Sequence, residues 1–204
     1  MSNRSSHWEN VYTTKAENEV SWFQENPAIS LRLIRDAHAT PNSRIIDIGG
    51  GASRLVDALL AQGFRALSVL DISAAALEAA KKRLGAESAQ VDWIVADITK
   101  WTPTGVYDIW HDRAALHFLT HPADRSAYID RLRAATSPGS QVIIGTFAPD
   151  GPEKCSGLPV QRYSSQSLAA LLGPGFELAA STDEAHHTPW DAIQHFQFSR
   201  FRRV

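Results

Sequence analysis

The sequence has little cysteine and no long apolar run. Of its 204 residues only Cys155 is a cysteine, which excludes an internal disulfide and a zinc site built from several cysteines. No stretch of about 18 apolar residues is present, so no transmembrane helix is expected. The first ten residues, MSNRSSHWEN, lack the apolar segment of a secretory signal. We therefore expect a cytoplasmic protein that does not associate with a membrane.

Neither sign of charge dominates the chain. Lysine and arginine number 20 against 22 aspartates and glutamates, and the basic residues are scattered apart from a short C-terminal cluster, RFRRV. This balance argues against a protein that binds nucleic acid. Apolar residues make up 44% and charged residues 21%, as in globular domains. The length suits one domain over residues 1–204, with residues 1–26 as an N-terminal arm.

Strand and helix patterns alternate after the arm. This alternation predicts an α/β fold with a mostly parallel sheet. A hairpin of two late strands, over residues 176–181 and 192–201, is expected at the sheet edge. The other expected strands cover residues 44–48, 66–70, 91–96, 106–110 and 141–147, and the expected helices cover residues 27–39, 53–62, 74–84, 123–135 and 164–172.

A glycine-rich turn joins the first of these strands to a helix that begins at Ser53. Its residues are Asp47-Ile48-Gly49-Gly50-Gly51. Glycines allow a ligand to approach the backbone closely, and the helix N-terminus offers free N–H groups. The third glycine of a dinucleotide-binding turn is missing, and Asp47 would repel a pyrophosphate. A ligand that carries a positive charge is therefore favoured over a ligand-free turn or a dinucleotide.

Two more carboxylates end the next two strands. Asp71 can accept hydrogen bonds from both hydroxyls of a ribose, or it can cap a helix, although Ser73 already suits that role. Asp97 can accept from the amine of adenine, with Ile72 and Ile98 on the two faces of the ring. Taken alone, Asp97 is equally typical of an ordinary turn. With Asp47, the two carboxylates lie where ligands bind in open α/β sheets.

At these residues the chain resembles the class I S-adenosylmethionine-dependent methyltransferases. The segments DIGGGAS, LDIS and ADIT are similar to the cofactor-binding motifs of that family. The resemblance implies a Rossmann-like, three-layer fold with seven strands in the order 3-2-1-4-5-7-6 and an antiparallel last strand. It implies S-adenosyl-L-methionine as cofactor. The cofactor-binding residues expected from the motifs and from this resemblance are Asp47, Gly49, Gly50, Gly51, Ser53, Asp71, Ile72, Asp97, Ile98, His111 and Trp22.

The sequence predicts the residues that would bind the methyl acceptor less clearly than those that would bind the cofactor. We expect catalytic roles for His111 and Asp112, with His111 as the candidate general base. The alternative for His111 is a positioning contact with the cofactor. The adjacent pair His186-His187 has no third ligand at a metal-binding spacing, so no metal is expected. Candidate acceptor contacts are Arg113, His117, Cys155, Arg162 and Tyr163, although an inert thiol is favoured for Cys155.

The sequence therefore predicts a methyltransferase with a small-molecule acceptor. A weaker resemblance to small lysine methyltransferases, carried by Trp8, Tyr12 and Trp22-Phe23, keeps a protein acceptor open. Those enzymes carry D-K-G-x-x-D after the fourth strand, whereas this chain has DRAALH. A nicotinamide-dependent oxidoreductase and a non-catalytic S-adenosylmethionine-binding module are the remaining alternatives. The N-terminal aromatic residues are expected either to cover the pocket or to pack on the sheet.

Overall fold

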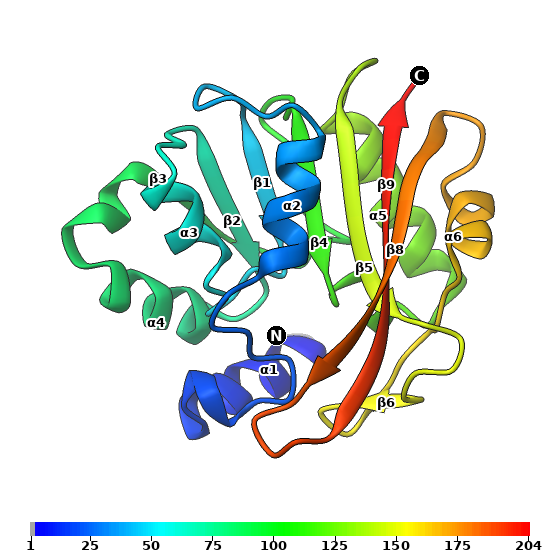
Figure 1. The fold of residues 1–204 in the computed structure, drawn as a ribbon. Helices are drawn as coiled ribbons and strands as arrows, with labels where there is room; N and C mark the ends of the chain where they lie inside the picture. The colour runs from blue at the N-terminus through cyan, green and yellow to red at the C-terminus, as the bar shows by residue number, and fades with distance from the viewer. Residues whose placement is uncertain (1–2) are drawn as a thin grey trace.

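A seven-stranded sheet lies at the centre of the protein (Figure 1). The computed structural model describes residues 3–204. The strand order β3-β2-β1-β4-β5-β9-β8 is the predicted order 3-2-1-4-5-7-6, because the two-residue strands β6 (Lys154–Cys155) and β7 (Leu158–Pro159) form a separate hairpin. Only β9 runs antiparallel to its neighbours. The sheet strands are β1 (Ile45–Ile48), β2 (Leu67–Asp71), β3 (Val91–Val95), β4 (Ile109–Arg113), β5 (Gln141–Phe147), β8 (Phe176–His187) and β9 (Ile193–Arg203).

Helices cover both faces of the sheet, as the alternation of side chains along the strands requires. In β1, Ile45 packs into the core on the side of α2, α3 and α4, whereas Ile46 and Ile48 pack on the side of α5 and α6. The predicted Rossmann-like arrangement of three layers is therefore confirmed. The helices are α2 (Ala28–Asp36), α3 (Leu55–Ala61), α4 (Ala74–Leu84), α5 (Pro122–Ala134) and α6 (Ser165–Leu172), with short 3-10 turns η1 (Glu17–Glu19), η2 (Gly85–Gln90) and η3 (Leu116–Phe118).

Helix α4 begins and ends as its sequence predicts. The side chain of Ser73 accepts a hydrogen bond from the backbone N–H of Ala76, which satisfies one of the free donors of the first turn. Gly85 follows the last turn with φ of +57°, a conformation that is unfavourable for residues other than glycine. These caps fix the N-terminus of α4 directly beside the carboxyl end of β2.

The N-terminal arm contains a helix that the sequence pattern did not indicate. Helix α1 (Asn3–Thr14) lies across the carboxyl ends of the parallel strands (Figure 1). It docks on the start of α4, where the carboxylate of Glu9 accepts from the hydroxyl of Ser73 at 2.8 Å and from the backbone N–H of Ala75 at 3.3 Å. A carboxylate is favoured at that position by the helix dipole. The first two residues of the arm predicted over residues 1–26 lie outside the described part.

Two predicted strands differ from the structure. The fourth strand begins at Ile109 instead of residue 106, because Val106 is exposed and the pairing with β1 begins only at Ile109. The strand predicted over residues 176–181 extends through the expected loop to His187. Its polar sequence TDEAHH is held by pairing with β9 rather than by its own hydrophobicity. The bend at Leu178 to Ala180 adjusts the register of this long hairpin.

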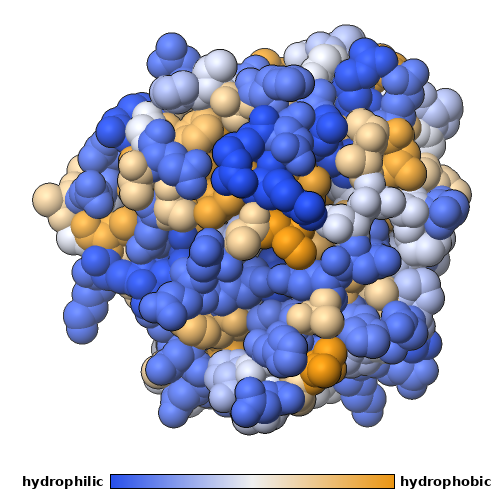
Figure 2. All heavy atoms as spheres, viewed as in Figure 1, coloured by the Kyte–Doolittle hydropathy of each residue, from blue (hydrophilic) through white to orange (hydrophobic). Residues whose placement is uncertain are grey.

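The surface carries no gathered apolar patch on the face shown in Figure 2, where apolar residues are scattered among hydrophilic ones. Within residues 3–204, no helix combines the length and the apolar content that crossing a membrane requires.

Candidate functional site

Two small cavities lie where the parallel strands end, beneath α1. The central cavity has a volume of about 100 Å³, and a second cavity beside the glycine loop has about 50 Å³. Tyr12, Trp22, Gly49 and Arg113 border both and separate them. These volumes are below the roughly 300–1,000 Å³ of small-molecule pockets. Arg4, Trp8 and Tyr12 on α1 line the central cavity and narrow it.

The glycine loop needs glycine at each of its three positions. Gly49 has φ of +67° and Gly51 has φ of +44°. A Cβ atom on Gly49 would lie 2.6 Å from the Cβ of Ala115, and one on Gly50 would lie 2.6 Å from Oδ2 of Asp47. A Cβ atom on Gly51 would lie 2.9 Å from Oδ2 of Asp71. The loop thus keeps the space beside both carboxylates clear.

Asp71 ends β2 and borders the central cavity together with Ile72. Its Oδ1 atom accepts from the backbone N–H of Ser73 at 2.8 Å, whereas Ser73 itself is the N-cap of α4, so Asp71 does not cap the helix. Burial, with a further contribution from nearby Asp47, raises the pKa of Asp71 to about 7. A ligand that donates hydrogen bonds to this carboxylate would relieve that cost.

Asp97 forms the ordinary turn that the sequence allowed, and its contact with adenine stays a prediction. It borders the central cavity next to Ile98. Its Oδ1 atom accepts from the backbone N–H and the hydroxyl of Thr99, at 3.0 and 2.8 Å. Its Oδ2 atom lies 3.5 Å from the guanidinium of Arg4 on α1. The turn is therefore rigid while the second carboxylate oxygen faces the covering helix.

Asp47, His111 and Ser30 form a buried chain of hydrogen bonds. The distance from Nδ1 of His111 to Oδ1 of Asp47 is 2.7 Å, and Nε2 lies 2.9 Å from the hydroxyl of Ser30 on α2. All three border the second cavity, as does Ser53, which was predicted to bind cofactor. Both ring nitrogens of His111 are occupied. This geometry supports the positioning alternative for His111 and gives it no free nitrogen to act as a base.

The structure gives no support to the catalytic role predicted for Asp112. Its side chain is fully buried and borders neither cavity. The carboxylate accepts from the backbone N–H groups of Ala115 and Leu116 and from the hydroxyl of Tyr128. These bonds hold the turn in which Ala114 has φ of +70°, a strained conformation for alanine. Asp112 therefore shapes the cavity wall instead of contacting reactants.

Aromatic residues cover the central cavity from α1 and the segment that follows it. The ring of Trp8 makes edge-to-face contacts with Trp22 at 5.6 Å and with Phe118 at 4.9 Å between centroids. The indole N–H of Trp22 donates to the hydroxyl of Tyr12 at 3.3 Å. Both predicted alternatives hold, because the rings border the cavity and also pack on one another.

The five candidate acceptor residues divide into two groups. Arg113 and Cys155 border the central cavity, and burial raises the pKa of the Cys155 thiol to about 11, which keeps it protonated. The other three border neither cavity. His117 is buried with its pKa lowered to about 3, Tyr163 packs in the core, and Arg162 binds Glu153 and the carbonyl of Gly151.

Several residues that border the central cavity were not predicted from the sequence. Arg4, Phe118, Ala115 and Leu119 border the central cavity. Their position depends on the tertiary fold. Helix α1 places Arg4 over the sheet, and the turn after β4, which Asp112 holds, places the other three residues at the cavity. His186 does not lie in a loop between the two expected late strands: it is buried in β8, with Nε2 2.7 Å from the carbonyl of Ser21.

Comparisons with known proteins agree with this site. Residues 45–139 match the sequence model of the methyltransferase domain family, and these residues contain Asp47, the glycine loop, Asp71 and Asp97. The chain contains a class I S-adenosylmethionine-dependent methyltransferase domain. A ubiquinone biosynthesis O-methyltransferase of Rhodopseudomonas palustris is 32% identical over 106 residues, which are 51% of this chain and 39% of that protein. The chain thus spans about two fifths of the curated relative it matches.

Solved structures show the same fold for the methyltransferase domain and the segments around it. An S-adenosylmethionine-dependent methyltransferase of Anabaena variabilis superposes with a TM-score of 0.74 at 15% identity, over 99% of this chain and 96% of that one. A Burkholderia thailandensis 1,6-didemethyltoxoflavin-N1-methyltransferase, solved with bound 1,6-didemethyltoxoflavin and S-adenosylhomocysteine, gives a TM-score of 0.69 at 20% identity, over 98% of this chain and 85% of that one.

The residues of the methyltransferase domain fit the cofactor of this class, S-adenosyl-L-methionine. Asp71 is a buried carboxylate whose pKa falls if hydroxyl groups donate to it. The positions of Gly50 and Gly51 leave room beside Asp47 and Asp71 that any Cβ atom would fill. Acidic side chains also suit a cofactor with ammonium and sulfonium charges.

Proposed function

We propose that this methyltransferase domain moves the methyl group of S-adenosylmethionine to a small-molecule acceptor by in-line displacement. One observation carries the proposal. The same central cavity is bordered by Gly49, Asp71 and Asp97, which suit the cofactor, and by aromatic rings, Arg113 and Cys155, which suit an acceptor. Cofactor and acceptor groups would therefore meet inside one covered space.

Three carboxylates and the glycine loop would bind the cofactor. Asp71 would accept from the ribose hydroxyls, and Asp97 from the adenine amine, with Ile72 and Ile98 against the ring. Asp47, the glycine loop and Ser53 would hold the methionine portion. His111 and Ser30 keep Asp47 in place through the hydrogen bonds at 2.7 and 2.9 Å. Trp22 borders both cavities and would lie beside the sulfonium, where an aromatic face favours positive charge.

When bound, the cofactor supplies a methyl group already activated by its sulfonium sulfur. The chain's own task is to align the acceptor and exclude water. Trp8 and Tyr12 on α1, with Trp22, close the cavity from above. Arg113 donates a hydrogen bond to the carbonyl of Trp22 at 2.8 Å and would contact the acceptor. The cover formed by α1 supports a compact acceptor over a side chain of another protein.

Calorimetric titration tests the cofactor. We expect S-adenosylmethionine and S-adenosylhomocysteine to bind with micromolar dissociation constants and NAD to show no binding. Asp71→Ala should weaken binding at least tenfold, while Asp130→Ala on the exposed face of α5 should not change it. Binding of NAD alone, or an unchanged affinity of Asp71→Ala, would contradict the proposal.

A transfer assay tests the acceptor class. The protein is incubated with a cell lysate and a tritiated methyl donor, and the products are separated by size. We expect label in the small-molecule fraction. Label only in the protein fraction would instead support the protein-lysine alternative, and a chain that binds the cofactor but transfers no label would be a binding module.

A further inference from the structure

Arg113 is a buried cation whose hydrogen-bonding capacity is only partly used. It is the last residue of β4, its side chain is 11% exposed, and it borders both cavities. Its Nη1 atom donates to the carbonyl of Trp22. Within the described residues, Nε and Nη2 have no hydrogen-bond partner. Unpaired buried donors are costly, so they call for an explanation.

The two unpaired atoms lie on the same edge of the guanidinium plane. That edge is the one that binds an oxyanion through two parallel N–H···O bonds. The plane is held from one side by the ring of Phe196, whose centroid lies 4.6 Å from Cζ of Arg113. The edge is therefore preorganised and does not need to be ordered when a ligand binds.

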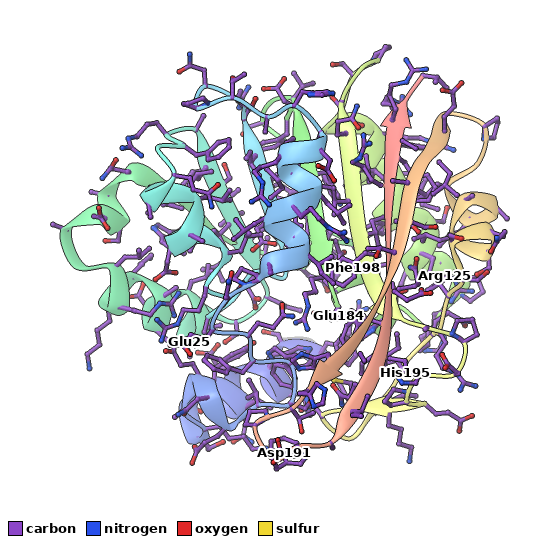
Figure 3. All side chains as sticks on the ribbon, viewed as in Figure 1. Glu25, Arg125, Glu184, Asp191, His195 and Phe198 are labelled. Carbon is purple, nitrogen blue, oxygen red and sulfur yellow. The ribbon has the colours of Figure 1, made fainter. Side chains whose placement is uncertain are left out.

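Glu184 on β8 forms an ion pair with this edge but no hydrogen bond, and its Oε2 atom is likewise buried without a hydrogen-bond partner among the described residues. Its Oε2 atom lies 3.9 Å from Nη2 of Arg113, which is beyond hydrogen-bond distance. Its Oε1 atom instead accepts from Gln24 at 2.7 Å. Figure 3 labels Glu184 on β8 near the end of the sheet that faces α1. Burial lowers the pKa of Arg113 to about 10, so the cation persists at neutral pH.

Among the described residues that border the central cavity, none on the acceptor side is free to remove a proton. His111 has both nitrogens engaged with Asp47 and Ser30. Burial raises the pKa values of the Cys155 thiol and the Tyr12 hydroxyl, so neither is ionised at neutral pH. Asp71 and Asp97, the two carboxylates that border this cavity, lie on the cofactor side. An acceptor that still carried its proton would therefore have no base to take it.

We propose that the acceptor is a small planar compound that enters as an oxyanion, such as an acidic phenol or enol, and that Nε and Nη2 of Arg113 bind this anion. The inference rests on the proposed function. A lone pair of the ionised acceptor forms the new bond to the methyl carbon, the carbon–sulfur bond breaks, and its electrons go to sulfur. The anion and the sulfonium both become neutral, and no proton has to leave. Trp8, Trp22 and Phe118 provide flat walls for the ring.

A binding experiment tests this without knowledge of the natural acceptor. The protein saturated with S-adenosylhomocysteine is titrated with 2,4-dinitrophenolate, and separately with 2,4-dinitroaniline, a neutral ring of similar shape. We expect the anion to bind at least tenfold more tightly. Arg113→Met should remove that preference by weakening only the anion, and Arg35→Met on the exposed face of α2 should retain it.

Two further variants sharpen the test. Arg113→Lys keeps the charge but loses the two-pronged edge, so an intermediate preference is expected. Glu184→Gln removes the competing carboxylate and should tighten anion binding. Equal binding of the two probes to the native protein, which requires no variant to fold, would overturn the inference. S-adenosylhomocysteine binding without anion preference overturns this inference alone, whereas absence of S-adenosylhomocysteine binding overturns the proposed function.

Discussion

The imidazole of His111 lies 2.7 Å from the carboxylate of Asp47 through Nδ1, with Nε2 2.9 Å from the hydroxyl of Ser30. The three side chains are buried, and they come from β1, β4 and α2. In the arrangement with a neutral ring, Nδ1–H donates to Asp47 and Nε2 accepts from Ser30. His111 thus fixes the orientation of an acidic group that faces the glycine loop.

This relationship predicts a selective loss of cofactor binding in His111→Ala. The substitution removes the hydrogen bond that holds the Asp47 carboxylate in place, so this carboxylate is no longer oriented toward an ammonium group. We expect S-adenosylhomocysteine to bind at least tenfold more weakly. Methylthioadenosine, which lacks the amino acid portion, should lose less than threefold. Equal losses for both compounds in calorimetry would show general damage and contradict the positioning role.

Cofactor binding should depend on pH through Asp71. Its pKa is raised to about 7 in the folded protein, above the ordinary value of 3.8. The ribose hydroxyls need the ionised carboxylate as acceptor. Affinity for methylthioadenosine should therefore fall as the pH drops below about 7, by up to about tenfold per pH unit, and level off above it. Asp71→Asn should bind weakly at every pH. A native protein whose affinity is constant from pH 5 to 8 would refute the assignment.

The same raised pKa affects stability in the opposite sense. Between pH 4 and pH 7 the unfolded chain carries Asp71 ionised, whereas the folded protein holds it protonated. The contribution of this group to the free energy of unfolding therefore falls as the pH rises through that window. Comparing the pH dependence of chemical denaturation for the native protein and Asp71→Asn isolates the effect. Identical slopes would contradict it.

Gly49→Ala should destabilise the fold for two separable reasons. The positive φ of Gly49 costs about 1–2 kcal/mol for any other residue, and the new Cβ atom would lie 2.6 Å from that of Ala115. Gly63→Ala is a matched control, because Gly63 has φ of +89° and an open side. We expect Gly49→Ala to lose more unfolding free energy than Gly63→Ala. Adding Ala115→Gly should recover only the excess, and additive losses would refute the contact.

The thiol of Cys155 reports on the cover formed by α1. It is 5% exposed and its pKa is raised to about 11, so modification by a disulfide reagent at pH 8 should be slow. Trp8→Ala removes rings packed over the cavity and should accelerate the reaction at least threefold. Trp190→Ala, at an exposed position of the β8–β9 hairpin, serves as the control. Rapid modification of the native protein would contradict a closed cover.

The sequence predicted those features that local pattern determines. The run from Ile45 to Gly51 combines a buried strand with a turn that only glycine permits, so the loop and the neighbouring carboxylates could be placed in advance. Helix α1 could not, because its residues are mostly polar and its few apolar contacts depend on where it docks. Arg113 was identified as a candidate, but its unpaired edge follows from Trp22, Phe196 and Glu184, which lie far from it in the chain.

Strand β9 follows β5 and β8 in the chain, yet it lies between them in the sheet. During synthesis β5 and β8 are complete before β9, so neither can pair with it until β9 has been made. Phe196, the ring beneath Arg113, is on β9, and so is every residue that pairs with Glu184 and its neighbours. The packing that holds the Arg113 guanidinium therefore forms only once β9 has joined the sheet, although the aromatic rings, Arg113 and Cys155 that border the central cavity all precede β9 in the chain.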